Sequence, residues 1–132
     1  MIVNRVKKVP VVIQAEAVEC GAANLAMIMA YYGKHIPLTK VREECGVSRD
    51  GTTAKKIMLA AQKYGLNAKC YKYETDEIMQ SGVFPSIIHW NFNHFVVLCG
   101  FKGKRAVIND PIRGRITVSQ KEFDESFTGG MH

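Results

Sequence analysis

The chain has 132 residues, of which 47% are hydrophobic and 23% are charged, and it carries a net charge of +6. This composition is typical of one globular domain spanning 1–132 and argues against a disordered or fibrous protein, because a chain of this length buries roughly two-thirds of its unfolded surface. No apolar stretch approaches the roughly 20 residues that a membrane-spanning helix needs, and residues 1–8 do not resemble a secretory signal. We therefore expect a soluble domain that is not exported.

The basic residues lie in small groups, and no zinc finger, RNA-binding aromatic motif or helix-turn-helix accompanies them. We therefore expect that the domain does not bind nucleic acid. Two interpretations of the positive charge stay open, a solvated surface and an acidic polypeptide partner.

Apolar residues at helical spacing predict three helices in the first half of the chain. Their ranges are 20–32, 39–45 and 53–64. A glycine follows each range, as is typical of a helix C-terminus: Gly33, Gly46 and Gly65. The run 47–51 between the second and third helices is predicted to be a turn.

In the second half the apolar period changes to the period of two that is typical of β-strands. The predicted strands are 66–71, 86–90, 94–101, 105–109 and 115–118. A short helix is predicted at 75–80, and the capping box of Ser119 and Glu122 predicts a last helix that buries Phe123 and Phe127. Helices followed by a meander of strands predict an α+β fold, with N-terminal helices packed on a C-terminal antiparallel β-sheet.

The four cysteines are far apart in the sequence, so no Cys-x-x-Cys pair suggests a metal site. Without an export signal, disulfides are not expected, and we interpret Cys45, Cys70 and Cys99 as structural residues. Cys20 differs because it lies at the first turn of a predicted helix, where free amides and the helix dipole favour a thiolate. Cys20 is therefore the candidate nucleophile.

A nucleophilic cysteine needs a base, an orienting group and donors for the developing oxyanion. His94 is the candidate base because it opens a predicted strand, although a backbone carbonyl could also satisfy its ring. Asp110 ends the next strand, so hairpin pairing would bring it beside His94, although Asp-Pro also opens turns. Gln14 and the Cys20 amide are the candidate oxyanion donors, the alternative for Gln14 being an exposed polar residue.

The segment 14–28, with the sequence QAEAVECGAANLAMI, closely resembles the signature of the double-glycine leader peptidases. These are papain-like cysteine peptidase domains at the N-termini of peptidase-containing ABC transporters that mature and export bacteriocins. Further matching segments extend the resemblance over nearly the whole chain: 31–33, 45–51, 90–98, 109–111 and 123–129. The pattern is most similar to the branch that serves lanthipeptide-type and nitrile-hydratase-leader-type precursors.

The resemblance implies a catalytic role for each candidate residue. Cys20 would attack the carbonyl of the second leader glycine, and His94 would form the thiolate and then protonate the leaving amine. Asp110 would orient His94, and Gln14 would line the oxyanion hole. No metal or cofactor is implied, since ATP would act only at the nucleotide-binding domain of the transporter.

The resemblance also implies how the substrate is held. The leader would bind as an amphipathic helix in an apolar groove, and a narrow channel beside the nucleophile would admit only glycines. The basic surface of the chain, rather than the resemblance, suggests that the leader is acidic. Trp90, Asn91 and Phe92 are candidate walls of this channel, the alternative being core or turn residues. The implied partners are the precursor peptide and the transmembrane and nucleotide-binding domains of the same transporter, at the cytoplasmic side of the bacterial membrane.

Two features depart from the family pattern. Asn24 stands where a serine or cysteine is expected, and we interpret it as a packing change. The sequence stops where the family continues into membrane domains, which suggests an excised domain, and we interpret Gly129 and Gly130 as its terminus rather than as a cleavage site. Two alternative functions stay open, a non-catalytic leader-docking domain and another papain-like amide hydrolase or acyltransferase.

Overall fold

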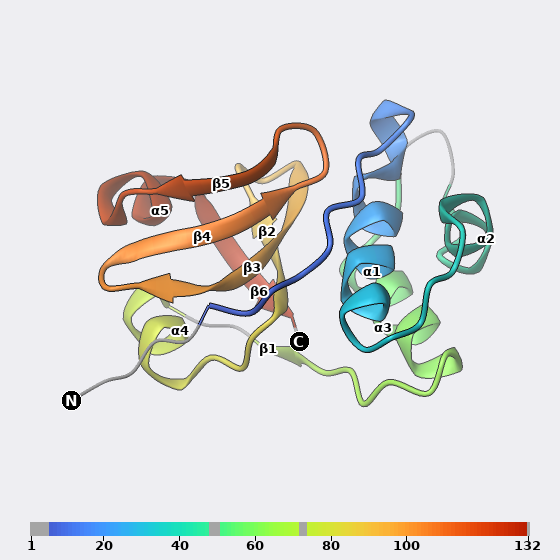
Figure 1. Cartoon of the computed structure of the whole chain (residues 1–132), viewed down its shortest axis with the longest axis horizontal. Helices are drawn as coiled ribbons and strands as arrows, with labels where there is room; N and C mark the ends of the chain where they lie inside the picture. The colour runs from blue at the N-terminus through green and yellow to red at the C-terminus, as the bar shows by residue number, and fades with distance from the viewer. Residues whose placement is uncertain (1–5, 48–50, 72–73, 132) are drawn as a thin grey trace.

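The computed structural model describes residues 6–47, 51–71 and 74–131 and has an α+β fold (Figure 1), which confirms the predicted fold class. The first half of the chain is helical and contains η1 (Ala17–Glu19), α1 (Cys20–Tyr31), α2 (Leu38–Glu44) and α3 (Ala54–Lys63). The second half contains β1 (Cys70–Tyr71), α4 (Thr75–Ser81), β2 (Ser86–Trp90), β3 (His94–Lys102), β4 (Arg105–Asp110), β5 (Gly114–Val118), α5 (Gln120–Ser126) and β6 (Phe127–Met131).

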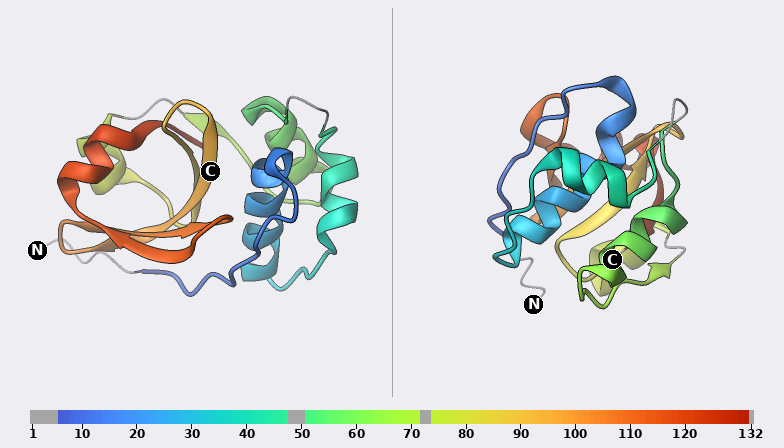
Figure 2. Two further views of the ribbon diagram at one scale, coloured as in Figure 1. Left: turned by 90° about the horizontal axis from the view of Figure 1, so that it is seen from above. Right: turned by 90° about the vertical axis from the view of Figure 1, so that its right-hand side faces the viewer.

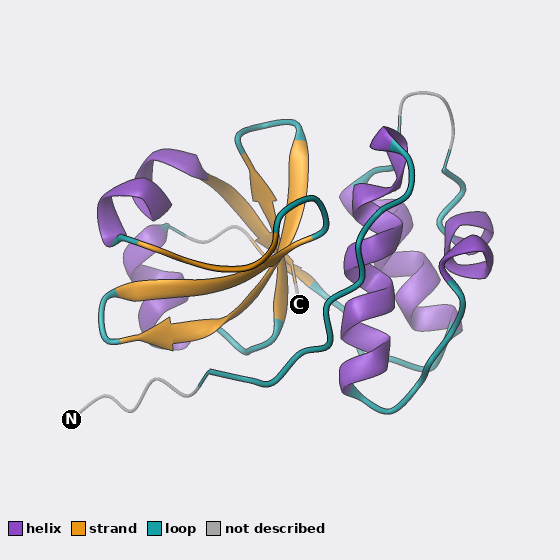
Figure 3. Cartoon of the chain, turned by 45° about the horizontal axis from the view of Figure 1, so that its top comes forward, coloured by secondary structure: helices purple, strands orange, loops and turns teal. Residues whose placement is uncertain are grey.

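The strands of the described chain form a six-stranded sheet in the order β1-β6-β2-β3-β4-β5, with antiparallel pairing throughout. Strands β2 to β5 follow one another as a meander, whereas β6 returns to the free side of β2. Helices α1, α2 and α3 lie together on one side of the sheet, and α4 and α5 lie on the other (Figures 1 and 3). The sheet curls around the side that holds α4 and α5 (Figure 2).

Two hydrophobic cores lie on the two sides of this sheet. The helical core joins α1, α2 and α3 to the sheet and includes Leu25, Met29, Val41, Ile57, Ile87 and Val97. The sheet core lies inside the curled sheet with α4 and α5 and includes Ile78, Ile88, Leu98, Phe101, Ile108 and Phe123. Because strand side chains alternate between faces, the adjacent residues Val97 and Leu98 belong to different cores.

Helix α1 is the centre of the helical core, and all of its residues from 21 to 29 are buried. It packs against α2 and α3 as well as against β3, so it is apolar on every side. A Cβ atom at Gly21 would lie 2.5 Å from Thr52 Cγ2 and 2.9 Å from Ile57 Cδ1. Glycine therefore allows α3 to approach the start of α1. Neither α1 nor another helix in the described part of the chain is long and apolar enough to cross a membrane.

The predicted strand 66–71 differs from the structure. Only Cys70–Tyr71 form strand β1, which pairs with β6. Leu66 and Ala68 alternate as in a strand because their side chains pack against the helical core from the segment that leads into β1. The predicted turn at 47–51 includes residues 48–50, which lie outside the described residues.

The end of the chain is a second difference. Helix α5 ends at Ser126, and Phe127, which was predicted to lie in this helix, begins β6. Its half-buried ring stacks on Phe123 with centroids 5.1 Å apart. Gly129 and Gly130, interpreted as a terminus, instead pair with β2 inside the sheet. Glycines carry no apolar alternation, so no pattern predicts this strand.

Candidate active site

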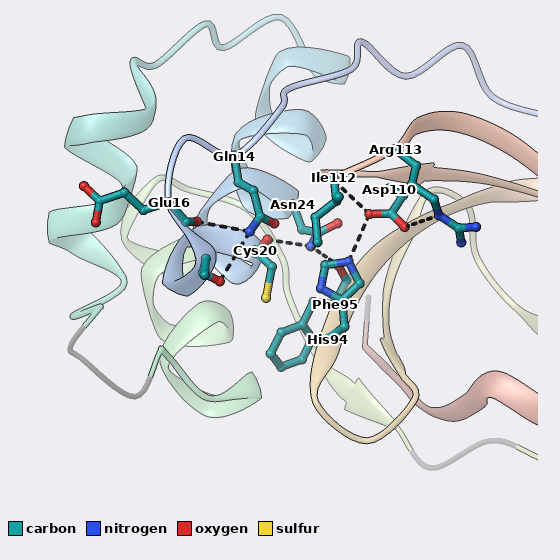
Figure 4. A network of polar contacts seen from close by, with 10 residues as sticks. Gln14, Glu16, Cys20, Asn24, His94, Phe95, Asp110, Ile112 and Arg113 are labelled. Atoms are coloured by element: carbon teal, nitrogen blue, oxygen red, sulfur yellow. Dashed lines mark hydrogen bonds and ion pairs between the residues drawn. The ribbon is translucent and has the colours of Figure 1, made fainter.

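Three of the predicted site residues lie at the ends of elements that meet in space (Figure 4). Cys20 is the first residue of α1, His94 is the first residue of β3, and Asp110 is the last residue of β4. Helix α1 packs against β3, and the β3–β4 register pairs Val97 with Asn109. The helical core and the strand register together bring these three residues to one place.

Asp110 accepts three hydrogen bonds in a nearly buried position. Its Oδ1 accepts from His94 Nε2 at 3.0 Å and from the Ile112 amide at 2.8 Å, and its Oδ2 accepts from Arg113 Nε at 3.1 Å. Burial raises the pKa of Asp110, but these bonds and the charge of His94 outweigh burial and lower the pKa overall. Asp110 is therefore ionised at neutral pH and holds Nε2 of His94 as a hydrogen-bond donor.

The side chains of Cys20 and His94 lie beside each other in the site (Figure 4), and each affects the pKa of the other. Burial raises the pKa of the Cys20 thiol, but the bonds from His94 and the Phe95 amide and the charge of His94 lower it overall. Burial lowers the pKa of His94, but its bonds with Cys20 and Asp110 outweigh burial and raise it. Both pKa shifts favour a thiolate–imidazolium pair.

The other three cysteines lie in different surroundings. Cys45 and Cys99 are buried, and burial raises the pKa of each thiol to about 11. Cys70, interpreted as structural, is exposed at β1, and partial burial raises the pKa of its thiol. Cys20 is thus the one cysteine of the four whose thiol pKa is lowered. Over the described ranges, no three His, Cys, Asp or Glu side chains are grouped closely enough to hold a metal ion.

Gln14 lies beside Cys20, and its backbone amide donates to the Pro111 carbonyl at 2.9 Å (Figure 4). Its side-chain Nε2 donates to the carbonyls of Glu16 at 3.1 Å and Ala17 at 3.3 Å. The amide hydrogens of Gln14 therefore face its own loop in this structure. Donation from Gln14 to an oxyanion stays a prediction, since it requires this side-chain amide to turn.

Glu19, which was not among the predicted site residues, is a buried carboxylate that organises the loop before the nucleophile. Glu19 is 3% exposed, and its Oε1 accepts from the Ala15 and Glu16 amides, both at 2.8 Å. Its Oε2 accepts from Arg42 Nη1 at 3.0 Å, which ties the loop to α2. Burial raises the pKa of Glu19, but these bonds outweigh burial and lower it. The three-residue spacing of Glu16 and Glu19, a capping box, is the sequence signal for this role.

The predicted channel walls lie in and after β2. Trp90 is 3% exposed and packs in the sheet core, with its ring 5.7 Å from that of Phe123, so it offers a peptide almost no surface. Asn91 and Phe92 lie exposed in the β2–β3 turn, and Phe92 is 80% exposed. Both have positive φ angles, 52° and 65°, which is unusual for residues other than glycine.

An apolar groove of about 320 Å³ lies along α1 and α3. Its lining residues come from these helices, from the segment before β1 and from the start of β2: Leu25, Ile28, Tyr32, Ile57, Met58, Ala61, Gly65, Leu66, Asn67, Ala68, Val83, Pro85 and Ile87. Sequence patterns do not place this groove, because its residues are distant in the chain and most also contribute to the helical core.

A thiolate–imidazolium pair between a helix N-terminus and a sheet, with a carboxylate behind the imidazole, is the arrangement of a papain-like cysteine peptidase. The model of the peptidase C39 family matches residues 8–131. The chain therefore belongs to the peptidase C39 family.

Curated relatives of the chain are processing and transport proteins. The chain is 40% identical over 123 residues to the colicin V secretion/processing ATP-binding protein CvaB of Escherichia coli, and this match covers 93% of the chain and 18% of the relative. It is 32% identical over 124 residues to the lactococcin-G-processing and transport ATP-binding protein LagD of Lactococcus lactis, with 90% and 18% covered. The chain therefore spans 18% of the length of these relatives.

Solved structures resemble the chain over almost its full length. A double glycine motif protease from an AMS/PCAT transporter, crystallised in complex with the leader peptide, has a TM-score of 0.93 and 59% identity, with 96% of this chain and 90% of that chain covered. The peptidase domain of Streptococcus ComA has a TM-score of 0.88 and 25% identity, with 95% and 97% covered. These similarities confirm the predicted fold and the cysteine peptidase class.

Proposed function

We propose that the domain cleaves the peptide bond after a Gly-Gly pair at the end of a leader, in precursors of exported peptides. The observation that carries this proposal is the meeting of Cys20, His94 and Asp110, with 3.0 Å between His94 Nε2 and Asp110 Oδ1 and a lowered pKa of the Cys20 thiol. The similarity to a double glycine motif protease in complex with the leader peptide supports the choice of substrate.

In the proposed mechanism, the Cys20 thiolate attacks the carbonyl carbon of the second leader glycine and a C–S bond forms. The oxyanion accepts from the Cys20 amide and from Gln14, once the Gln14 side-chain amide has turned away from its loop carbonyls. Collapse breaks the C–N bond, and the amine leaves with the proton of the His94 imidazolium. A water molecule then gives a proton to His94 and attacks the thioester carbonyl. The C–S bond breaks, the leader leaves as a carboxylic acid, and the thiolate–imidazolium pair of Cys20 and His94 is restored.

Selection of Gly-Gly follows from steric exclusion in this proposal. The substrate must place its scissile carbonyl next to Cys20, beside the turn that carries Asn91 and Phe92. The positive φ angles of these two residues are unfavourable, so the strands on either side must hold the turn in this conformation. A side chain on either substrate glycine would then collide with this wall, whereas glycine would pass.

We further propose that the groove along α1 and α3 binds the apolar face of a helical leader. The groove is lined mainly by apolar side chains, including Ile28 and Met58, and lies on the helix that carries Cys20. An amphipathic helix binds such a groove through apolar residues at helical spacing. The net charge of +6 favours an acidic leader, whose affinity would fall with increasing salt.

The groove assignment is tested by Met58→Glu, because a buried charge opposes an apolar helix face. We expect KM for a full leader substrate to rise by about tenfold or more, since loss of one well-buried apolar contact weakens binding by that order. Alkylation of Cys20 by iodoacetamide should be unchanged. An exposed exchange on the opposite side of α3, Lys56→Glu, is the matched control, because residues two apart on a helix face away from each other. An equal rise in KM for both variants would argue against the groove.

The names of the relatives support a wider context for the domain. CvaB and LagD combine processing with ATP-binding transport in one protein. We propose that this chain works as the peptidase domain of such an exporter, at the cytoplasmic side of the bacterial membrane, where its precursor is available before export. We also propose precursors of the lanthipeptide or nitrile-hydratase-leader type, on the strength of the motif around Cys20.

The main test of the proposed function uses a synthetic precursor whose leader ends in Gly-Gly, with cleavage followed by mass spectrometry. We expect one cut after the second glycine, and no cut when either glycine is replaced by valine. Equal cleavage of all three peptides would favour a general papain-like hydrolase. Binding of the leader without cleavage would favour a docking domain.

A further inference from the structure

Asn24 connects the two parts of the active site through one buried side chain. It lies on α1 one turn after Cys20 and is fully buried. Its Nδ2 donates to the carbonyl of Cys20 at 2.6 Å and to the carbonyl of Phe95 at 2.7 Å (Figure 4). The first bond lies within α1, and the second crosses to β3, at the residue that follows His94.

The Phe95 residue is therefore bound to α1 through its backbone carbonyl, which accepts from Asn24. Its backbone amide is one of the groups that lower the pKa of the Cys20 thiol. His94 is joined directly to Phe95 in the chain, so the position of Phe95 relative to α1 also determines the position of the imidazole relative to the thiol. The two hydrogen bonds from the Asn24 side chain are short, so they restrict the distance between α1 and the start of β3.

Packing alone does not explain an asparagine at this position. The Oδ1 of Asn24 is buried and has no hydrogen-bond partner among the described residues, which is unfavourable for stability. A residue that served only to fill space would be apolar or would satisfy both of its polar atoms. The two donors on Nδ2 are the feature that an apolar residue of the same size lacks.

We propose that Asn24 is a positioning residue that fixes the Cys20 thiol against His94 by bridging the carbonyls of Cys20 and Phe95. This inference rests on the proposed peptidase function and adds a residue to its machinery. It replaces the interpretation of Asn24 as a packing change. A serine at position 24 would bond back to the carbonyl four residues earlier but would lack a second donor for Phe95.

The test compares Asn24→Ser, which keeps only the bond within α1, with Asn24→Ala, which loses both bonds. The matched control is Ile78→Val, a mild change in the sheet core away from Cys20. For each variant we would measure the thermal midpoint, the pH dependence of Cys20 alkylation by iodoacetamide, and kcat and KM for the Gly-Gly precursor. His94, which lowers the Cys20 pKa, is unchanged in these variants, as are the nearby carboxylates Asp110, which binds His94, and Glu19, which precedes Cys20.

We expect Asn24→Ser to move the acid limb of the alkylation profile to higher pH by about half a unit. The reason is that His94 stabilises the Cys20 thiolate less when the two side chains are held less closely together. The value of kcat should fall by about tenfold with KM unchanged, since the leader groove is intact. Asn24→Ala should show a larger effect in the same direction. Ile78→Val should lower the thermal midpoint without moving the alkylation profile.

The positioning role is overturned if Asn24→Ser and Asn24→Ala lower only the thermal midpoint and their alkylation profiles overlay that of the unchanged protein. It is equally overturned if Ile78→Val moves the profile as far as they do. The alkylation measurement needs no precursor. An unchanged protein that fails to cleave the Gly-Gly peptide while the Asn24 variants still move the profile would refute the proposed function and leave the positioning role intact.

Discussion

The two sides of the active site are held in place by different kinds of interaction. On the helical side, Cys20 is fixed by side-chain packing, because residues 21–29 of α1 are buried between α2, α3 and β3. On the sheet side, His94 and Asp110 are fixed at strand ends by backbone register, and by hydrogen bonds to the Asp110 carboxylate. The helix that carries the nucleophile thus depends mainly on close packing, to which Asn24 adds a polar bridge to β3, whereas the base depends on polar contacts.

This difference predicts different outcomes for mutations on the two sides. Changes on the helical side should affect stability and the position of the thiol, since packing errors propagate through a dense core. Changes on the sheet side should mainly affect pKa values, since polar contacts there are made by single side chains. The following variants test that distinction, from the largest expected effect to the smallest.

Cys20→Ala removes the reactive group of the helical side and nothing else. We expect kcat for the Gly-Gly precursor to fall by at least about 10,000-fold, because no other group can replace the nucleophile. Leader affinity, measured by calorimetry, should stay within about twofold, since the thiol acts on the scissile bond and not on the leader helix. A large loss of leader affinity would mean that the two functions of α1 are not separate.

Asp110→Asn tests the sheet side by removing a charge while keeping the shape. We expect kcat to fall by about 100-fold, because the imidazolium loses the negative charge that stabilises it and keeps only a neutral amide oxygen as acceptor. Burial lowers the pKa of His94 and its bonds with Cys20 and Asp110 raise it overall, so loss of Asp110 should lower that pKa. The alkaline limb of the kcat/KM profile should therefore move to lower pH.

The control for Asp110→Asn is Asp124→Asn on the exposed surface of α5, which removes the same charge away from the site. Its pH–rate profile should overlay that of the unchanged protein. A movement of the alkaline limb to higher pH in Asp110→Asn would contradict the assignment of Asp110 as the partner of the imidazolium.

Gly21→Ala tests packing on the helical side without changing any polar group. The added Cβ would lie 2.5 Å from Thr52 Cγ2 and 2.9 Å from Ile57 Cδ1, so these side chains or the start of α1 must shift. We expect the free energy of unfolding to fall by about 1–3 kcal/mol, as is usual for overpacking, and kcat to fall as well because Cys20 is the adjacent residue. Urea unfolding and precursor cleavage measure the two effects.

Gly33→Ala is the control for Gly21→Ala, because it adds the same methyl group where no atom lies within 4 Å. Its φ of +85° makes alanine unfavourable by roughly 1 kcal/mol. This variant should therefore lose some stability but keep kcat. Equal losses of kcat in the two variants would show that the crowding at Gly21 does not reach the thiol.

The sequence predicts those parts of this architecture that depend on local patterns. The helix start at Cys20 and the strand ends at His94 and Asp110 follow from periodicity and turn residues. Strand β6 does not, because Gly129 and Gly130 have no pattern and their pairing with β2 depends on the whole sheet.

Sequence patterns also do not predict the long-range partners of the polar residues that support the site. Glu19 and Asn24 each act through partners 23 or 71 positions away, Arg42 and Phe95, and only the folded chain brings these partners near. Trp90 was a candidate wall of the substrate channel, with a core position as the alternative, and strand alternation places its ring in the sheet core. Position near a catalytic residue in the sequence is therefore a weak guide to the contacts of a side chain.

Arg113→Ala should have the smallest effect, although Arg113 bonds directly to Asp110. The guanidinium is 54% exposed, and water and salt screen an ion pair of this kind. Burial raises the pKa of Asp110 and the bond from Arg113 is one of those that lower it overall, so its loss should raise that pKa. A carboxylate with a lowered pKa stabilises the fold until the pH falls through the folded pKa, so acid unfolding of the variant should begin at slightly higher pH.

At neutral pH Asp110 stays ionised and bonded to His94 in this variant, so kcat/KM should fall by no more than about threefold. Arg113→Lys, which keeps the charge without the planar fork, should lie between the two proteins in acid unfolding. A loss of kcat/KM comparable to that of Asp110→Asn would mean that the charge of Arg113 is needed to hold the carboxylate toward His94. The position of His94 and Asp110 would then depend on an exposed side chain, whereas the position of Cys20 depends on buried ones. The two sides of the site would differ in burial as well as in the kind of interaction that holds them.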